Sequence, residues 1–132
     1  MIVIDTHIWI WWVHGHPDLK AWMRERLLEQ ESDQIGVSVI SCWEIARLVA
    51  DSKLDLNRSI SAWFAIALAY PGVELIDLSP EISIDSNNLP GEFHRDPADR
   101  IIVATARMND CDLLTADTKI LQYANVKLAK SH

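Results

Sequence analysis

The stretch Ile2-Val3-Ile4-Asp5-Thr6 begins the chain with a short β-branched run that stops at an acidic residue. A tryptophan-rich segment follows and ends at Gly15-His16-Pro17, so the pattern predicts a buried strand over residues 2–4 that leads into a helix. Unbroken apolar runs of this length are typical of parallel strands that are buried on both faces. We therefore expect Asp5 to lie at the carboxyl end of the first strand.

The alternation of apolar strands and helical segments continues to the end of the chain. Further strands are predicted over residues 35–39, 73–76, 112–114 and 126–128. Helices are predicted over residues 18–29, 41–50, 59–70 and 80–86, and from 96 and 118 onward, with Asp18 and Ser41 at the starts of the first two. The sequence thus predicts one α/β domain over residues 1–132, a three-layer α/β/α sandwich around a central, mainly parallel sheet.

Composition is consistent with one domain in a reducing compartment. The 132 residues are 49% hydrophobic, which is enough for a core without disulfides or a structural metal. Cys42 and Cys111 form no C-x-x-C pair, so we expect free thiols. The first residues lack the features of a secretory signal, and the longest uncharged stretch, residues 59–73, is shorter than the roughly 18 residues of a membrane span. We expect a cytoplasmic protein that does not enter a membrane.

The net charge of −7 argues against a general basic surface that would bind nucleic acid. An anionic substrate would need metal ions or a local group of cationic side chains. His94, Arg95 and Arg100 are the candidates for phosphate contact, although Arg100 could equally form a salt bridge on a helix surface. The histidine spacings match none of the usual zinc ligand pairs.

Four acidic residues lie at or near the predicted strand-to-helix junctions: Asp5, Glu44, Asp99 and Asp117. Each alone can be explained as a helix cap, and Ser41 with Glu44 fits the capping-box pattern. Together they are more informative, because the carboxyl ends of parallel strands meet at one edge of a sheet and ligands bind there. Carboxylates brought together repel one another unless a cation is present, and oxygen ligands suit Mg²⁺ or Mn²⁺.

The same acids occur in four motifs whose order resembles the PIN-domain family, and the chain resembles VapC-type toxins in particular. The resemblance covers essentially all 132 residues. The motifs are Val3-Ile4-Asp5-Thr6-His7, Ser41-Cys42-Trp43-Glu44-Ile45, Asp96-Pro97-Ala98-Asp99-Arg100 with the apolar residues that follow it, and Leu114-Thr115-Ala116-Asp117. The resemblance implies a metal-dependent endoribonuclease that hydrolyses RNA phosphodiester bonds and is held inactive by a cognate antitoxin protein.

Carried over by position, the resemblance places the catalytic acids at Asp5, Glu44, Asp99 and Asp117. We expect these four residues to bind one or two Mg²⁺ (or Mn²⁺) ions per subunit, with Thr115 as a helper that orients the water on the metal. Asp96 is interpreted as a helix cap beside the site. The loop over residues 87–95 is the segment least constrained by the family pattern, so we expect substrate preference to depend on it.

Partners and a competing function also follow from the resemblance. A homodimer is expected, alone or within a larger toxin–antitoxin assembly, and the uncharged helix over residues 60–70 is either core or dimer interface. Most of the six tryptophans are expected in the core, with one or two of those in the first two helical segments exposed as a groove for an antitoxin segment or the partner subunit. The alternative function is a non-catalytic PIN-fold module that binds RNA or protein, which would show no metal-stimulated nuclease activity.

Overall fold

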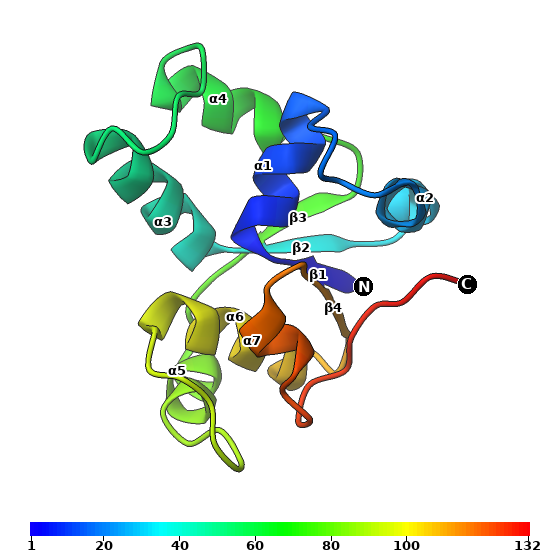
Figure 1. Cartoon of the computed structure of the whole chain (residues 1–132), viewed down its shortest axis with the longest axis vertical. Helices are drawn as coiled ribbons and strands as arrows, with labels where there is room; N and C mark the ends of the chain where they lie inside the picture. The colour runs from blue at the N-terminus through cyan, green and yellow to red at the C-terminus, as the bar shows by residue number, and fades with distance from the viewer.

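The computed structural model describes all 132 residues and contains one four-stranded sheet in which every pair of neighbouring strands is parallel (Figure 1). The strand order is β3-β2-β1-β4, so the chain moves outward from the central β1 and then crosses to its other side for β4. The order therefore reverses between β1 and β4, which is where parallel sheets bind ligands. The strands are β1 (Ile2–Ile4), β2 (Ile35–Ser38), β3 (Val73–Ile76) and β4 (Asp112–Leu114).

Helices cover both faces of this sheet, as the predicted three-layer sandwich requires. Figure 1 shows α1, α3 and α4 on one side and α5, α6 and α7 on the other. The helices are α1 (Thr6–His14), α2 (Ala21–Glu29), α3 (Val39–Ala50), α4 (Ile60–Ala67), α5 (Pro80–Ser86), α6 (Pro97–Met108) and α7 (Thr118–Leu121), with a short 3₁₀ helix η1 (Gln30–Ser32) after α2. None of them is both long enough and apolar enough to cross a membrane.

Each face of the sheet has its own hydrophobic core. The larger core holds 16 buried residues around Trp9 and Trp63, whose rings meet edge to face with centroids 5.0 Å apart. The smaller core holds nine buried residues from β1, β4, α6 and the C-terminal segment, together with Leu89 from the loop after α5. The strands are not all buried on both faces as predicted, because the edge strand β3 exposes Glu74 and Leu75.

Two predicted helix starts are wrong. Helix α2 begins at Ala21 rather than at Asp18, and Lys20 precedes it without a capping side chain. The backbone N–H of Asp18 instead contacts Nδ1 of His16 in the preceding turn. Helix α3 begins at Val39, two residues earlier than the sequence suggested, because Ser38 rather than Ser41 caps it.

The predicted C-terminal strand and the end of α4 also differ. Residues 126–128 form no strand, and only Leu128 makes a single parallel bridge to Leu113. Helix α4 ends at Ala67 instead of residue 70, with Trp63 and Ala67 buried in the larger core. The predicted strands over 2–4, 73–76 and 112–114 and the helix over 80–86 are confirmed at both ends. Both cysteines are free thiols, as expected.

Candidate active site

Pairing between β1 and β4 brings Asp5 beside Thr115. Ile4 pairs with Leu114, and the N–H of Asp5 donates to the carbonyl of Leu114 at 3.0 Å, which extends the ladder by one residue. The Thr115 hydroxyl then donates to Oδ2 of Asp5 at 2.7 Å. It also accepts the N–H of Asp117 at 3.0 Å. One hydroxyl therefore links the acid after β1 to the acid before α7.

The other Asp5 oxygen fixes the start of α1. Oδ1 accepts the N–H of Thr6 at 2.7 Å, and Asp5 has the extended backbone of an N-cap residue. Its side chain is buried, with only 4% of the residue exposed. The predicted capping role is confirmed, and both carboxylate oxygens have protein partners.

Thr6 connects this acid to Glu44 on α3. Its hydroxyl donates to Oε1 of Glu44 at 2.6 Å and lies 2.8 Å from Oγ of Ser41. Ser41 and Glu44 do not form the predicted capping box. Because α3 already begins at Val39, these two residues share one helix face, and that face meets the start of α1. Thr6 was not predicted as a site residue, and its position directly after Asp5 was the available signal.

Asp99 lies in the first turn of α6. Asp96 caps this helix, as predicted, with Oδ1 accepting the N–H groups of Ala98 at 3.0 Å and Asp99 at 3.5 Å. Nε2 of His94 lies 2.9 Å from Oδ2 of Asp99, at ion-pair distance but without the alignment of a hydrogen bond, and it has no other partner. The fourth acid, Asp117, caps α7 through the N–H groups of Lys119 and Ile120.

The carboxylates raise one another's pKa values. Burial raises the pKa of Asp5, and the Asp117 charge adds to this effect against the hydrogen bond from Thr115. Burial also raises the pKa of Glu44, and the charges of Asp5 and Asp96 raise it further. The pKa of Asp99 rises to about 7, first because of burial and then because of its four acidic neighbours Asp5, Asp96, Asp117 and Glu44. The acids that are distant in sequence are therefore close enough in space to repel one another.

This donor set fits a divalent cation in its chemistry. All four predicted ligands offer carboxylate oxygens, which Mg²⁺ and Mn²⁺ prefer, and a cation would balance the repulsion that raises the Asp99 pKa. The arrangement is not that of a ready-made site, because no group of three or more His, Cys, Asp or Glu side chains is placed so that it could hold a metal ion. The protein itself occupies several of these oxygens, as with Glu44 and Thr6 or Asp99 and His94.

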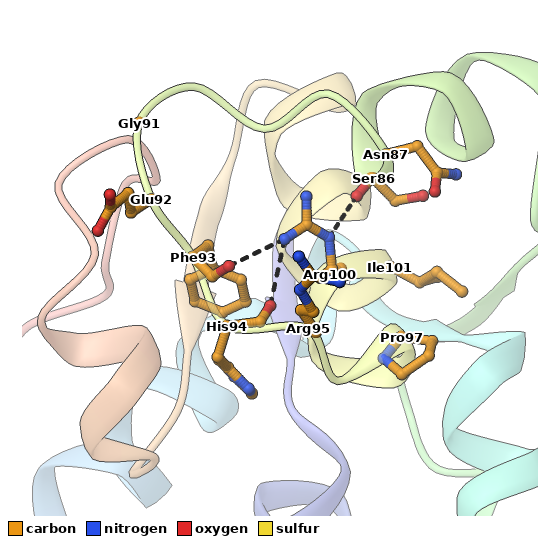
Figure 2. Close-up of a pocket in the computed structure, with 10 residues that line it drawn as sticks. All are labelled: Ser86, Asn87, Gly91, Glu92, Phe93, His94, Arg95, Pro97, Arg100 and Ile101. Atoms are coloured by element: carbon orange, nitrogen blue, oxygen red, sulfur yellow. Dashed lines mark hydrogen bonds between the residues drawn. The ribbon is translucent and has the colours of Figure 1, made fainter.

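A cavity of about 910 Å³ lies next to this site, between the loop over residues 87–95 and the first turns of α6 (Figure 2). Arg100 forms one wall. Its Nε donates to the carbonyl of Ser86 at 2.7 Å, and Nη1 donates to those of Phe93 and His94 at 3.0 and 3.2 Å. The alternative of a surface salt bridge for Arg100 is wrong, since its guanidinium instead holds the two ends of the loop together.

The other candidates for phosphate contact point in different directions. Arg95 is exposed and lines the cavity, whereas the His94 imidazole points away from the Arg100 guanidinium in Figure 2. The tip of the loop is fixed separately, because the Tyr123 hydroxyl donates to the carbonyl of Pro90. Hydrogen bonds thus fix the loop at its ends and at its tip, and Arg95 is the exposed cationic side chain that it presents to the cavity.

These features define a parallel α/β domain with a partly buried acidic site where the strand order reverses. The sequence matches the PIN domain family over residues 2–126. The chain belongs to the PIN-domain family.

Individual relatives agree with this assignment. The chain is 27% identical over 119 residues to Ribonuclease VapC22 of Mycobacterium tuberculosis (strain ATCC 25618 / H37Rv), which covers 90% of this chain and 88% of that protein. Two solved structures share the fold. VapBC2 from Rickettsia felis bound to a promoter DNA fragment has a TM-score of 0.72 at 22% identity, with full coverage of both chains. DNA-bound VapBC from Salmonella typhimurium has a TM-score of 0.70 at 16% identity, covering 97% of this chain and 96% of that one.

Proposed function

We propose that this protein is a Mg²⁺- or Mn²⁺-dependent endoribonuclease that acts as the toxin of a toxin–antitoxin pair. The observation that carries the proposal is the partly buried carboxylate cluster at the switch between β1 and β4, in a PIN-domain chain that is similar to a ribonuclease. A purely structural role does not account for this cluster, because acids that raise one another's pKa values destabilise the fold at neutral pH.

Asp5, Asp99 and Asp117, with Glu44 alongside, are the residues that would hold one or two ions per subunit. When bound there, the metal would activate a water molecule for attack on phosphorus and stabilise the charge that develops on the scissile phosphate. No histidine base is then required. Because the pKa of Asp99 is raised to about 7, a nearby cation would increase the ionised fraction of this carboxyl at neutral pH.

The residues around the acids act by positioning them. Thr115 holds Asp5 by one hydrogen bond and receives another from the backbone of Asp117, so its hydroxyl sets the separation of these two acids. Thr6 performs the same task for Glu44. We assign Thr115 chiefly to this positioning role, because its hydroxyl proton is already directed at Asp5 and only acceptor capacity remains for a water.

The RNA strand would approach along the cavity beside the loop over residues 87–95. Arg95 is the exposed cation on that wall and is our candidate for contact with an RNA phosphate. Arg100 would contribute to RNA binding only indirectly, by positioning the loop, because its three side-chain hydrogen bonds go to backbone carbonyls. His94 contacts Asp99 at ion-pair distance and would reach a phosphate only after leaving that carboxylate.

The partners of the proposed toxin follow from the same family. Structural neighbours include a toxin–antitoxin complex from Klebsiella pneumoniae, with a TM-score of 0.67 at 22% identity and coverage of 98% of this chain and 97% of that one. We propose a cognate antitoxin protein for this chain and a homodimer, alone or in a larger assembly, acting in the cytoplasm. An antitoxin arginine directed at the acid cluster would compete with the metal for the same carboxylates.

One observation favours the second candidate, a non-catalytic PIN-fold module that binds RNA or protein. No three of the carboxylates are placed so that they could hold one metal ion. A binding module does not need such a placement, whereas a metal-dependent nuclease does. The two candidates differ in metal dependence.

The deciding experiment incubates purified wild-type chain and Asp5→Asn with single-stranded RNA, in Mg²⁺, in Mn²⁺ and in EDTA. Cleavage by the wild type only, and only with metal, supports the nuclease. Calorimetric titration with Mn²⁺ should show uptake by the wild type and weaker uptake by the variant. Equal RNA stability in all samples, with no metal uptake, would overturn the proposal in favour of the binding module.

A further inference from the structure

A second cavity, of about 570 Å³, lies on the other side of the first turn of α6. Pro97 lines both cavities, so the two flank the same helix start. Glu44 and Asp96 line the second cavity as well. A molecule that fills it therefore also lies against the carboxylate cluster. The volume falls within the roughly 300–1,000 Å³ of small-molecule sites in proteins.

Trp43 is the unusual side chain in this cavity. It is 54% exposed, whereas Trp9 and Trp63 are fully buried and the remaining three tryptophans are partly buried. The expectation that an exposed tryptophan would come from the first two helical segments is therefore wrong, because the exposed one is on α3. Trp43 directly precedes Glu44 in the chain, and the core does not enclose its indole.

Two cationic side chains lie near this indole, in a cavity that the acids Glu44, Asp51 and Asp96 also line. The Arg47 guanidinium carbon lies 5.4 Å from the Trp43 ring centroid, close enough for a cation–π contact. Arg47 also lies 3.8 Å from Asp51, and the exposed Lys53 lines the same cavity. Arg47 and Lys53 are thus the two cations of this cavity that can face a phosphate beside the exposed ring.

We propose that this cavity, the Trp43 pocket, binds an unpaired base of the RNA substrate by stacking on the indole, with Arg47 and Lys53 facing the adjoining phosphates. The inference rests on the proposed ribonuclease function and deepens it. Single-stranded RNA is recognised by stacking of bases on aromatic side chains and on arginine planes. The scissile phosphate must lie at the carboxylates, so a base in the Trp43 pocket belongs to a nucleotide close to the cut.

The test pairs protein variants with modified RNA. A short single-stranded RNA with one cleavage site is prepared with an abasic nucleotide at each position in turn. For the wild type, we expect kcat/KM to fall about tenfold at one position near the cut, mainly through KM, because one stacked base is lost. On intact RNA, the kcat/KM of Trp43→Ala should be about tenfold lower than that of the wild type. This variant should show no further loss when the abasic nucleotide stands at that position. Trp43→Phe should recover most of the wild-type behaviour.

The matched control is Ile84→Ala, which removes a side chain that is 66% exposed on α5. It should cleave like the wild type. Thermal unfolding of Trp43→Ala should also match the wild type, since the indole lies outside the core. If the wild type and Trp43→Ala lose activity equally at every abasic position, the base pocket is excluded.

Binding measurements keep this test separate from the nuclease proposal. The same RNA series is titrated against Asp5→Asn and against Asp5→Asn with Trp43→Ala, so that cleavage is not needed. Loss of position-dependent binding in the second protein supports the Trp43 pocket even if no RNA is cut. A Trp43→Ala effect confined to self-association in light scattering, or to binding of an antitoxin chain, would overturn it.

Discussion

Helix α1 joins two buried regions of opposite character. Towards its middle, Trp9 is fully buried against Trp63, whose indole N–H donates to Nε2 of His14 at 2.8 Å. At its start, Asp5 is almost as deeply buried, but burial raises its pKa and its neighbours are also acids. The first region stabilises the fold, and the second opposes it unless a cation binds there, as the proposed function requires. Stability and activity should therefore respond to different substitutions.

The largest expected effect is on activity, from Asp5→Asn. An Asn side chain can still cap α1, but it cannot supply the negative charge for the metal. Cleavage of RNA should fall on the order of a thousandfold, because a metal ion supplies several kcal/mol of transition-state stabilisation. The unfolding midpoint should stay the same or rise. Initial rates and thermal melts measure the two quantities, and a melt that falls together with the rate would contradict the separation.

The opposite pattern is expected for Trp63→Ala in the larger core. Removing a fully buried indole should lower the free energy of unfolding by about 3–5 kcal/mol, through lost burial and the cavity left behind. Urea titration measures this change, and the fraction that remains folded should retain its cleavage rate. Leu28→Ala, at a side chain that is 66% exposed, serves as the control and should change stability by less than about 0.5 kcal/mol.

A smaller effect is expected for Arg100→Ala, on α6 beside the loop over residues 87–95 and outside both regions. It removes hydrogen bonds to three backbone carbonyls and should reduce stability by roughly 1–3 kcal/mol. Hydrogen exchange should accelerate in the loop over residues 87–95 and much less in β1. Arg100→Lys should not restore protection, because an ammonium group cannot reproduce the planar fork of the guanidinium. Unchanged exchange in the alanine variant would contradict the role assigned to Arg100.

The smallest effect concerns pH in the absence of metal. The pKa of Asp99 is about 7 in the folded protein against an ordinary 3.8, so the folded state binds this proton more tightly than the unfolded state. The stabilisation from this group is complete below about pH 4 and is lost as the pH rises to about 7. The raised pKa values of Asp5 and Glu44 act in the same direction.

Asp99→Asn should remove part of this pH dependence. At pH 7.5 without metal, we expect its unfolding midpoint to exceed that of the wild type by about 3–6 °C, which corresponds to roughly 1 kcal/mol. The difference should shrink at pH 5, and Mg²⁺ should raise the midpoint of the wild type more than that of the variant. Calorimetric scans at the two pH values provide the measurement. If the unfolding midpoints of both proteins changed with pH in the same way, the acidic neighbours of Asp99 would not destabilise its ionised form.

Most of the architecture could be predicted from the sequence because local signals and tertiary structure agree. The apolar run at residues 2–4 clearly indicates a buried strand. The start of α6 is marked twice, because Asp96 caps the helix and Pro97 occupies its first position. The prediction failed where two serines competed to cap α3. Ser38 takes that role because β2 ends there, and Ser41 is then free to turn towards Thr6.

The site could be predicted in part for a similar reason. Parallel pairing makes the acids after β1 and β4 neighbours, so Asp5 and Asp117 could be placed together before the structure was known. The contacts that orient these acidic side chains could not be predicted from the sequence. Thr6 reaches Glu44 across 38 residues of chain, and the ion-pair contact of His94 with Asp99 depends on a loop that Arg100 holds in place. Such contacts depend on three-dimensional packing and leave no periodic signal.

The use of Asp5 and Asp117 as helix caps has a consequence for how such a protein can lose the proposed activity. Asparagine begins helices as well as aspartate does, and one base change in the codon converts aspartate to asparagine. Mutation therefore has a short route from an enzyme to a folded but inert copy that would still occupy its binding partners. Proteins of this architecture can therefore readily give rise to inactive variants that compete with the active form for its binding partners.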